Sequence, residues 1–481
     1  MVLLFLILSN TCSSNAANSY PTLVKDPTFW RNNEIPPHLS FKFNDGSQLR
    51  LLLANANDNP DFGFGFFTKG NNTNAFYLVV VKFMTFYDVP PIVVWSANRD
   101  EPVGEFATLE LRDGDVVLRN EDGYIIWSTE TPGSIARRLH VIDGGDLRLV
   151  DNRHTLIWNS FNHPTDVWIP GQVLGLKHVL TSSISNSNFS SGIFHLGVTI
   201  DSIRAYVDSD PLQIYRTIFP FHESNEFYNF SIGFLNYTSG SVKYQSSGGD
   251  FQYIRLEPNG HLNVYQLVDG YNQTLISNVL EDKQYGDCSY PEVCGTYGIC
   301  SDGQCSCPES SGSYFRPSNS SLGSFECAQV APLSCQDTGF VDLNNVTYFS
   351  FVPQLLFTNP ENCKRECLKN CSCKAALFSL KNKVEENELA SLVDESNEDM
   401  QCHKEDAVKV MEIAILCLQT NLYKRPTAAK VVRFLEGLTN VEPISDYKFL
   451  TMIHIDEEPV ATPADACYIS PITASVLSGP R

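Results

Sequence analysis

Short runs of alternating apolar and polar residues dominate the first 280 positions of the chain. The alternation predicts strands at Ala107–Leu111, Val116–Arg119, Tyr124–Trp127, Leu139–Ile142, Leu147–Val150 and Leu156–Trp158. Turn-forming pairs such as Asp113-Gly114 and Asp122-Gly123 separate them, as expected for tight hairpins. The pattern therefore predicts a mainly β protein built from short antiparallel strands.

Three tryptophans mark an internal repeat within this region. Trp95 and Trp127 are 32 residues apart, and Trp127 and Trp158 are 31 residues apart, each in a similar apolar strand. A short fixed period is typical of repeated supersecondary units that share one core. We expect the three indole rings to meet in the middle of that core.

Two stretches of this repeat resemble bulb-type lectin domains: Val94–Pro102, which contains Trp95, and Trp158–Asp166. The resemblance assigns residues 35–175 to such a domain and implies a β-prism of three four-stranded sheets. Residues 176–280 continue the aromatic-rich β pattern, for example at Phe251–Leu256. We interpret them as a second β domain, and a second lectin-like prism is one form that it could take.

The resemblance also points to a carbohydrate site. Mannose pockets of the family use the pattern Q-x-D-x-N-x-V-x-Y, and the nearest match here runs from Leu111 to Arg119. Asp113 and Val117 fit the pattern, whereas Leu111, Asp115 and Arg119 replace the Gln, Asn and Tyr. The candidate carbohydrate-binding residues are therefore Asp113, Asp115 and Val117. Because hydrogen-bonding side chains are missing, we expect mannose binding to be weak or absent.

Eleven of the fifteen cysteines lie between Cys288 and Cys373. The first six are spaced C-x5-C-x5-C-x4-C-x-C-x19-C in a segment too short and too polar to bury a large core. Such a segment depends on disulfides and hence on an oxidising compartment. Zinc is the alternative, but zinc sites favour C-x2-C pairs, which are missing among these six cysteines. Spacing alone leaves fifteen possible pairings of six cysteines open.

Residues 288–327 resemble an epidermal-growth-factor-like module, as seen in Cys294–Cys300 and Cys305-Ser306-Cys307. That resemblance implies the pairs Cys288–Cys300, Cys294–Cys305 and Cys307–Cys327. Residues 335–378, with Cys367-Leu368-Lys369-Asn370-Cys371-Ser372-Cys373, resemble the start of a PAN/apple module, and we place Cys367 and Cys373 among the disulfide cysteines. The two modules occur in this order in plant S-domain receptor-like kinases.

Export is indicated by the N-terminal segment together with the cysteines and the glycosylation sequons. Residues 1–16 read as a signal peptide, with an apolar run from Met1 to Leu8 and small residues at Ser14-Asn15-Ala16, although a buried N-terminal strand is the alternative. Glycosylation is predicted at the Asn-X-Ser/Thr sites Asn71, Asn188, Asn229, Asn236, Asn272, Asn319, Asn345 and Asn370. No apolar run of about eighteen residues follows the signal, so we expect a secreted, extracellular chain without a membrane span.

The pattern changes after residue 378. Residues 379–407 form an acidic linker, and two amphipathic helices are predicted at 408–418 and 431–438. The helices, with Arg425-Pro426-Thr427 between them, resemble the end of a plant receptor-like kinase, so we assign 408–440 as a C-lobe remnant and 441–481 as a tail. We expect nothing after about residue 385 to pack on the preceding domains.

The net charge of −21 argues against nucleic acid as a partner. The kinase resemblance lacks an ATP loop, a catalytic lysine and a catalytic loop, without which phosphoryl transfer is not expected. We therefore predict a lectin-like extracellular recognition protein that is not an enzyme, needs no cofactor or metal, and binds a glycan or an extracellular peptide or protein, with related receptor-like kinases as associates. The alternative is an incomplete sequence of a membrane receptor serine/threonine kinase that uses ATP.

Overall fold

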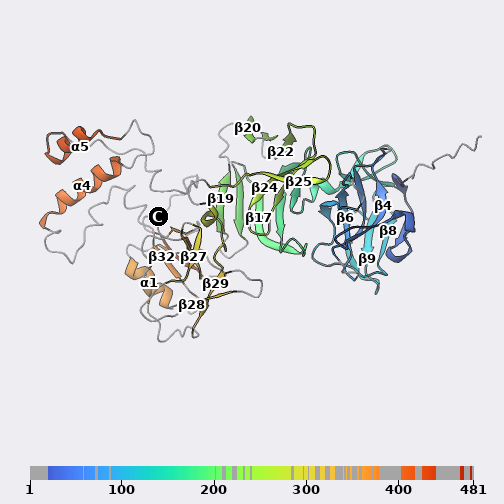
Figure 1. Cartoon of the computed structure of the whole chain (residues 1–481), viewed down its shortest axis with the longest axis horizontal. Coiled ribbons are helices and arrows are strands. Elements are labelled where there is room, and N and C mark those ends of the chain that lie inside the picture. Colours follow the sequence, from blue (N-terminus) through green and yellow to red (C-terminus); the bar gives the residue numbers. More distant parts are fainter. Residues whose placement is uncertain are drawn as a thin grey trace, which may run out of the picture.

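The computed structural model describes residues 20–57, 59–70, 74–85, 88–200, 202–207, 213–218, 225–230, 233–238, 241–282, 286–295, 297–301, 303–308, 315–319, 325–330, 340, 343, 347–348, 355–356, 360–369, 373, 375–378, 402–417, 425–439, 466–470 and 477–478. The fold is mainly β, as predicted. Two β units lie next to each other along the long axis, followed by a disulfide-rich part and a pair of helices (Figure 1). The predicted signal peptide and most of the acidic linker lie outside the described residues.

The first β unit, residues 23–159, contains three antiparallel sheets. The first has the order β1 (Leu23–Lys25), β11 (Arg138–Val141), β12 (Leu147–Val150) and β13 (Leu156–Asn159). The second has the order β10 (Ile125–Ser128), β9 (Asp115–Arg119), β8 (Thr108–Arg112) and β2 (Thr28–Arg31). The third has the order β3 (Ser40–Lys42), β4 (Gln48–Ala54), β5 (Phe62–Thr68), β6 (Tyr77–Lys82) and β7 (Ile92–Ser96).

Two expectations about this unit are wrong. The third sheet has five strands and not four, because β3 pairs with β4 and extends the edge. The unit also begins before residue 35, because β1 and β2 each complete a sheet formed by later strands. Unlike the short strands of the repeat, β1 and β2 lie outside its regular spacing, so only tertiary pairing places them.

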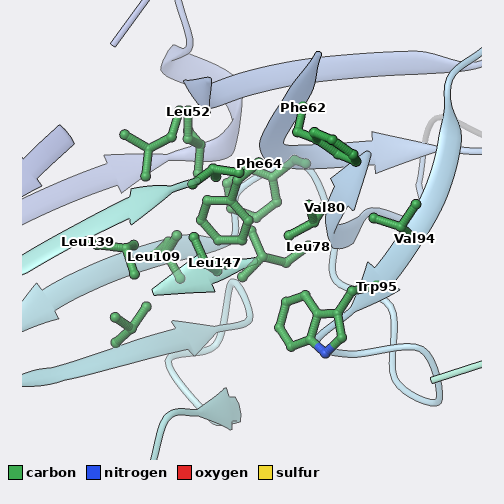
Figure 2. Close-up of a cluster of buried hydrophobic side chains, with 14 of the residues drawn as sticks. Leu52, Phe62, Phe64, Leu78, Val80, Val94, Trp95, Leu109, Leu139 and Leu147 are labelled. Carbon is green, nitrogen blue, oxygen red and sulfur yellow. The ribbon is translucent and has the colours of Figure 1, made fainter. Parts of the chain in front are cut away.

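The core of the first unit lies between the three sheets. Figure 2 shows Phe64, Leu78, Leu109, Leu139 and Leu147 pointing inward from different sheets, and all are at most 1% exposed. The tryptophan prediction is confirmed: the ring centroids of Trp95, Trp127 and Trp158 lie 5.6–5.8 Å apart, edge to face. This arrangement is a favoured geometry for aromatic pairs.

The second β unit, residues 167–278, also has three sheets, each with four strands. They are β14 (Val167–Trp168), β23 (Gln252–Leu256), β24 (Leu262–Val268) and β25 (Asn272–Asn278); β15 (Val173–Gly175), β22 (Ser241–Ser246), β21 (Gly233–Thr238) and β20 (Asn225–Phe230); and β16 (Val179–Ser183), β17 (Ser191–Val198), β18 (Ile203–Val207) and β19 (Gln213–Ile218). This is the prism-like form considered from the sequence. Trp168, which is fully buried, lies in its core. Because β14 and β15 pair with β23 and β22, the unit begins before residue 176.

The disulfide-rich part contains short strands and one helix. They are β26 (Ile299–Ser301), β27 (Gln304–Ser306), β28 (Phe315–Asn319), β29 (Phe325–Gln329), β30 (Thr347–Tyr348), β31 (Leu355–Leu356), α1 (Pro360–Lys369) and β32 (Ala375–Phe378). Two strands of the tail join it, namely β33 (Ala466–Ser470) between β31 and β32, and β34 (Leu477–Ser478) between β26 and β30. The expectation that nothing after residue 385 packs on this region is therefore wrong. The edges of β26, β30, β31 and β32 have backbone N–H and C=O groups that need hydrogen-bond partners, and the tail strands β33 and β34 pair with them.

The remaining helices are short. Four 3-10 helices, η1 (Asn32–Glu34), η2 (Pro37–Leu39), η3 (Ser160–Asn162) and η4 (Gly286–Ser289), lie between strands. Helix α4 spans Lys404–Cys417 and α5 spans Ala428–Leu435. The second predicted helix thus starts three residues earlier than expected, because Thr427 caps it by accepting a hydrogen bond from the Lys430 N–H. Among the described residues, none of the helices has the length and apolar character needed to cross a bilayer.

Candidate functional site

The candidate carbohydrate residues lie on the β8–β9 hairpin. Its two-residue turn, Asp113-Gly114, has positive φ angles of 51° and 78°. A Cβ at Gly114 would lie 2.5 Å from the Ser134 Oγ, so this turn requires glycine. Asp113 is exposed at the tip of the turn, where it is free to contact a solute.

Asp115 has a structural environment. The residue is 8% exposed, and its Oδ1 accepts hydrogen bonds from the Thr129 Oγ at 2.6 Å and from the Thr131 N–H at 3.2 Å. The carboxylate thereby anchors the chain that follows β10. An acceptor already engaged by two donors inside the protein has little capacity left for a sugar hydroxyl.

The third repeat contains the same anchor. Asp146 is fully buried, and it accepts from the Asn159 Nδ2 at 3.0 Å, the Ser160 Oγ at 3.2 Å and the Phe161 N–H at 3.1 Å. Asp115 begins β9, and Asp146 directly precedes β12. Each acid fixes the end of the tryptophan-bearing strand that follows, β10 or β13. Sequence reasoning treated Asp115 as a ligand candidate, whereas its equivalence to Asp146 explains it as a fixed part of the repeat.

The other positions of the motif lie on opposite faces of the hairpin. Leu111 is fully buried in the core, whereas Val117 and Arg119 are half-buried on the outer face. The Arg119 Nη1 donates to the Gly123 carbonyl at 3.1 Å. Asp113, Asp115 and Val117 therefore share a hairpin but differ in environment, and a polar side chain at position 111 would enter the core.

The predicted glycosylation sites are spread over the surface and the strands. Asn188 and Asn272 are exposed, Asn229 lies on β20, Asn236 is half-buried on β21, and Asn319 ends β28. Asn71, Asn345 and Asn370 lie outside the described residues. The exposed pair can accept a glycan without rearrangement of the fold.

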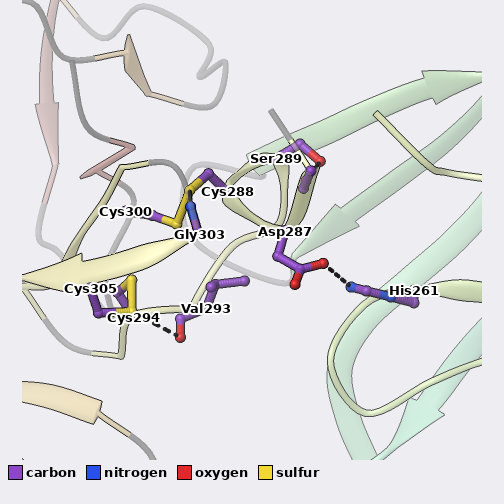
Figure 3. The surroundings of a disulfide bond; sticks show 10 residues. His261, Asp287, Cys288, Ser289, Val293, Cys294, Cys300, Gly303 and Cys305 are labelled. Atoms are coloured by element: carbon purple, nitrogen blue, oxygen red, sulfur yellow. Dashed lines mark hydrogen bonds and ion pairs between the residues drawn. A yellow bond between two sulfur atoms is a disulfide. The ribbon is translucent and has the colours of Figure 1, made fainter. Parts of the chain in front are cut away.

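The six cysteines of 288–327 form the pairs Cys288–Cys300, Cys294–Cys305 and Cys307–Cys327. These are the pairs that the family resemblance implied, and a fourth bond joins Cys367 to Cys373. Figure 3 shows two of the bonds next to the end of the second β unit, where His261 and Asp287 approach to 3.9 Å. Tyr290 stacks on His261, and burial is the main cause that raises the Tyr290 pKa to about 12.

Peptide mapping of the intact chain under non-reducing conditions should recover these three pairs. Replacing Cys294 and Cys305 together by serine should destabilise the module by about 2–4 kcal/mol, because an open loop gains entropy in the unfolded state. Replacement of the exposed Cys417 by serine is the matched control and should change little. Free thiols at Cys294 and Cys305 in the wild-type protein would contradict the pairing.

Arg99 joins the two β units, a role that the sequence did not reveal. The residue is 8% exposed, and its guanidinium donates to the carbonyl oxygens of Phe189 at 2.7 Å, Thr181 at 2.8 Å and Ser182 at 2.8 Å. Next to it, the Asp100 carboxylate accepts from the Ser191 N–H at 2.6 Å. Burial lowers the pKa of Arg99, while the nearby Asp166 and Asp100 carboxylates oppose that shift.

A second set of contacts between the units is aromatic and polar. Phe62 packs edge to face on Phe251 with centroids 5.7 Å apart, and the Lys82 ammonium lies over both rings. Tyr253 is fully buried, and desolvation raises its pKa. Tyr253 and Leu267 of the second unit belong to the same apolar cluster as the core of the first. The two units therefore share buried surface and not only a linker.

Within the described part of the chain, no group of three or more His, Cys, Asp or Glu side chains is arranged to hold a metal ion. The features that remain are thus the β8–β9 hairpin, the tryptophan-centred repeat and the disulfide-rich part. Comparison with known proteins extends this description.

Two families match parts of the chain: D-mannose binding lectin over residues 92–187 and PAN-like domain over residues 334–388. A G-type lectin S-receptor-like serine/threonine-protein kinase of Arabidopsis thaliana is 28% identical over 378 residues, which cover 70% of this chain and 40% of the kinase. EP1-like glycoprotein 2 of Arabidopsis thaliana is 27% identical over 348 residues, which cover 60% of this chain and 74% of that glycoprotein.

A monomeric monocot mannose-binding lectin from Gastrodia elata is 16% identical, with a TM-score of 0.18 over 29% of this chain and 96% of that structure. The chain spans about two fifths of the length of the receptor-like kinases that it matches. It carries a bulb-type lectin region and a PAN-like region, and its relatives are plant lectin receptor-like kinases and EP1-like glycoproteins.

Proposed function

We propose that this chain, a lectin-like relative of the ectodomains of plant S-domain receptor-like kinases, acts outside the cell as a recognition protein without catalytic activity. The observation that carries the proposal is the tryptophan-centred repeat within the region that matches D-mannose binding lectin. The proposed order is a lectin domain, a second β domain, an EGF-like module and a PAN-like module. Disulfides in the last two support an extracellular location.

The ligand class proposed is a carbohydrate, and an extracellular peptide or protein is the second candidate. A related receptor-like kinase is a candidate associate, because relatives named receptor-like kinases share this domain region. Glycan binding at the β8–β9 hairpin would rest on Asp113, the one motif acid that is exposed there.

Titration of the intact chain with mannose should show weak binding or none. Leu111 is buried in the core, Asp115 is engaged by Thr129 and Thr131, and Arg119 replaces the tyrosine, so the usual hydrogen-bonding groups are missing. A pocket that lacks its polar partners loses discrimination by orders of magnitude. Saturable binding of mannose in the micromolar range would contradict this prediction. If Asp113→Ala abolished that binding, the mannose site would lie at the β8–β9 hairpin.

The lack of catalysis is tested with ATP. Phosphoryl transfer requires a nucleotide loop, a lysine and metal-binding acids in fixed positions, and the described residues of the proposed remnant 408–440 hold most of α4 and all of α5. Magnesium-dependent thermal stabilisation of the chain by ATP would favour the alternative, a receptor serine/threonine kinase of which this sequence is a part. A glycan array probed with the intact chain tests the recognition function itself, and complete absence of glycan binding would overturn the carbohydrate proposal.

A further inference from the structure

The outer face of the sheet β1-β11-β12-β13 gathers positive charge on an acidic protein. Strand register pairs Lys25 with Arg138 across β1 and β11, and His140 with Arg148 across β11 and β12. Residues that face each other in antiparallel strands project to the same side of a sheet. We call the set Lys25, Arg138, His140 and Arg148 the basic face.

The basic face points away from the core. The alternate residues of the same strands, Leu139, Leu149 and Trp158, are buried between the sheets. The period of two in a strand therefore directs the cations outward. Lys25 is exposed and the Arg148 side chain is 39% exposed, so solutes can reach the surface.

The positive charge of this face is only partly neutralised within the protein. Arg148 pairs with Asp146 at 2.8 Å, and the neighbouring Arg137 pairs with Asp26 at 3.5 Å. Among the described residues, neither Lys25 nor Arg138 forms an ion pair. The exposed His154 borders the face, and its Nε2 accepts a hydrogen bond from the Arg138 Nη1 at 3.0 Å.

Asp151, the acid of the β12–β13 turn, is held by the backbone of that turn. Its Oδ1 accepts from the backbone N–H groups of Arg153 and Thr155, both at 2.7 Å. These hydrogen bonds lower the pKa of Asp151 and fix it in the turn. The acid therefore shapes the β12–β13 connection, and among the described residues it forms no ion pair with Arg138.

Two buried nitrogen atoms of the basic face have no hydrogen-bond partner: Arg138 Nε and His140 Nδ1. Buried polar groups normally find partners, and an unmade hydrogen bond costs stability. Because both atoms are covered by the protein, a ligand from outside would contact the terminal nitrogens of the half-buried Arg138, which can donate to a carboxylate.

Resting on the proposed carbohydrate recognition, we propose that the basic face binds an acidic polysaccharide, a chain of uronate sugars. Lys25 faces Arg138, and His140 faces Arg148 two residues along, so the cations form a staggered band across β1, β11 and β12, whose neighbouring strands lie about 4.8 Å apart. A uronate chain presents one carboxylate per sugar unit, and such a repeating charge suits this band. The exposed Leu23 and Leu156, at 38% and 46%, lie at the two edges of the sheet and offer apolar contacts to sugar rings.

A sugar polymer is favoured over an acidic peptide because β11, β12 and β13 all lie within the region that matches D-mannose binding lectin. The net charge of −21 also keeps a polyanion away from the rest of the surface, so binding would be confined to this sheet. Because the contacts are exposed, added salt should weaken the binding strongly.

The imidazole of His140 should make the binding pH-dependent. Burial is the main cause that lowers the His140 pKa, and Arg148, His154 and Arg138 lower it as well. Asp146 acts in the opposite direction and raises it. Lys25 on β1 is the remaining cation facing this set. A bound carboxylate favours the charged imidazole, and uronates stay ionised above about pH 4. Affinity should therefore rise as the pH falls from 7 to 5.

The test measures binding of the intact chain to a short polygalacturonate at low ionic strength. The double variant Lys25→Gln/Arg138→Gln should weaken the affinity by about tenfold or more. Arg31→Gln/Lys42→Gln removes the same charge from exposed positions on the other two sheets of the first β unit and should change the affinity less than twofold. If the first double variant does not fold, Lys25→Glu alone, an exposed change on an edge strand, should weaken binding measurably.

Each outcome decides the proposal. Salt-sensitive binding that only the basic-face variants weaken supports it. Equal loss with the control variant, or equally tight binding of poly-L-glutamate, overturns it in favour of nonspecific or peptide recognition. Binding of neutral glycans without polygalacturonate overturns the basic-face proposal but keeps the carbohydrate function, whereas binding of no glycan removes both.

Discussion

Trp95→Ala should lower the free energy of unfolding of the first β unit by about 3–5 kcal/mol, the usual range for a large aromatic deleted from a core. Trp95 is 5% exposed, packs edge to face on Trp127 and Trp158, and donates its Nε1–H to the His163 carbonyl at 2.8 Å. The substitution removes all of these contacts and leaves a cavity at the point where the three repeats meet. Urea unfolding followed by far-ultraviolet circular dichroism measures the loss.

The control for this experiment is Tyr124→Ala. Tyr124 lies close to Trp127 in sequence but is 71% exposed, so its removal should cost less than about 0.5 kcal/mol. Trp95→Phe should fall between the two, because it keeps an aromatic ring but loses the hydrogen bond. A Trp95→Ala protein as stable as wild type would mean that the tryptophan cluster is not the centre of the core.

Arg99→Met should uncouple the two β units, at a cost of about 3 kcal/mol or more. Methionine keeps most of the volume of the side chain but leaves the carbonyl oxygens of Phe189, Thr181 and Ser182 without their buried donor. Arg99→Lys should rescue little, because a single ammonium cannot reproduce the planar fork that reaches three acceptors.

Thermal unfolding and limited proteolysis report this uncoupling. We expect cleavage near the exposed Ile184 and Asn188 to become faster in Arg99→Met, since that loop is held by the guanidinium. Arg112→Met is the matched control, because Arg112 is 63% exposed and pairs only with Glu110 at the surface. Unchanged proteolysis in Arg99→Met would show that the aromatic contact of Phe62 with Phe251 suffices to hold the units together.

The sequence by itself determined the strands, the shared tryptophan core and the presence of a disulfide-rich module. Alternation with a period of two predicted strands, and the regular spacing of Trp95, Trp127 and Trp158 predicted a shared core, because both depend only on the geometry of one strand and its repeat. Cysteine spacing indicated a disulfide-rich module, and the family resemblance supplied the pairing. Each of these features depends on residues that are adjacent or regularly spaced in the sequence.

Only the tertiary structure decided the features that depend on pairing between distant segments. The short strands Leu23–Lys25 and Val167–Trp168 join sheets formed by residues more than eighty positions away, and no local pattern encodes such a partner. Asp115 stands where the family's sugar-binding motif has Asn, yet its hydrogen bonds to Thr129 and Thr131 make it an internal anchor. In the sequence, nothing distinguishes Arg99 from a surface cation, whereas in the structure the second unit buries it. Lys25, Arg138, His140 and Arg148 are scattered along the chain, and strand register alone brings them onto one face, because side-chain direction is fixed only once the strands have paired.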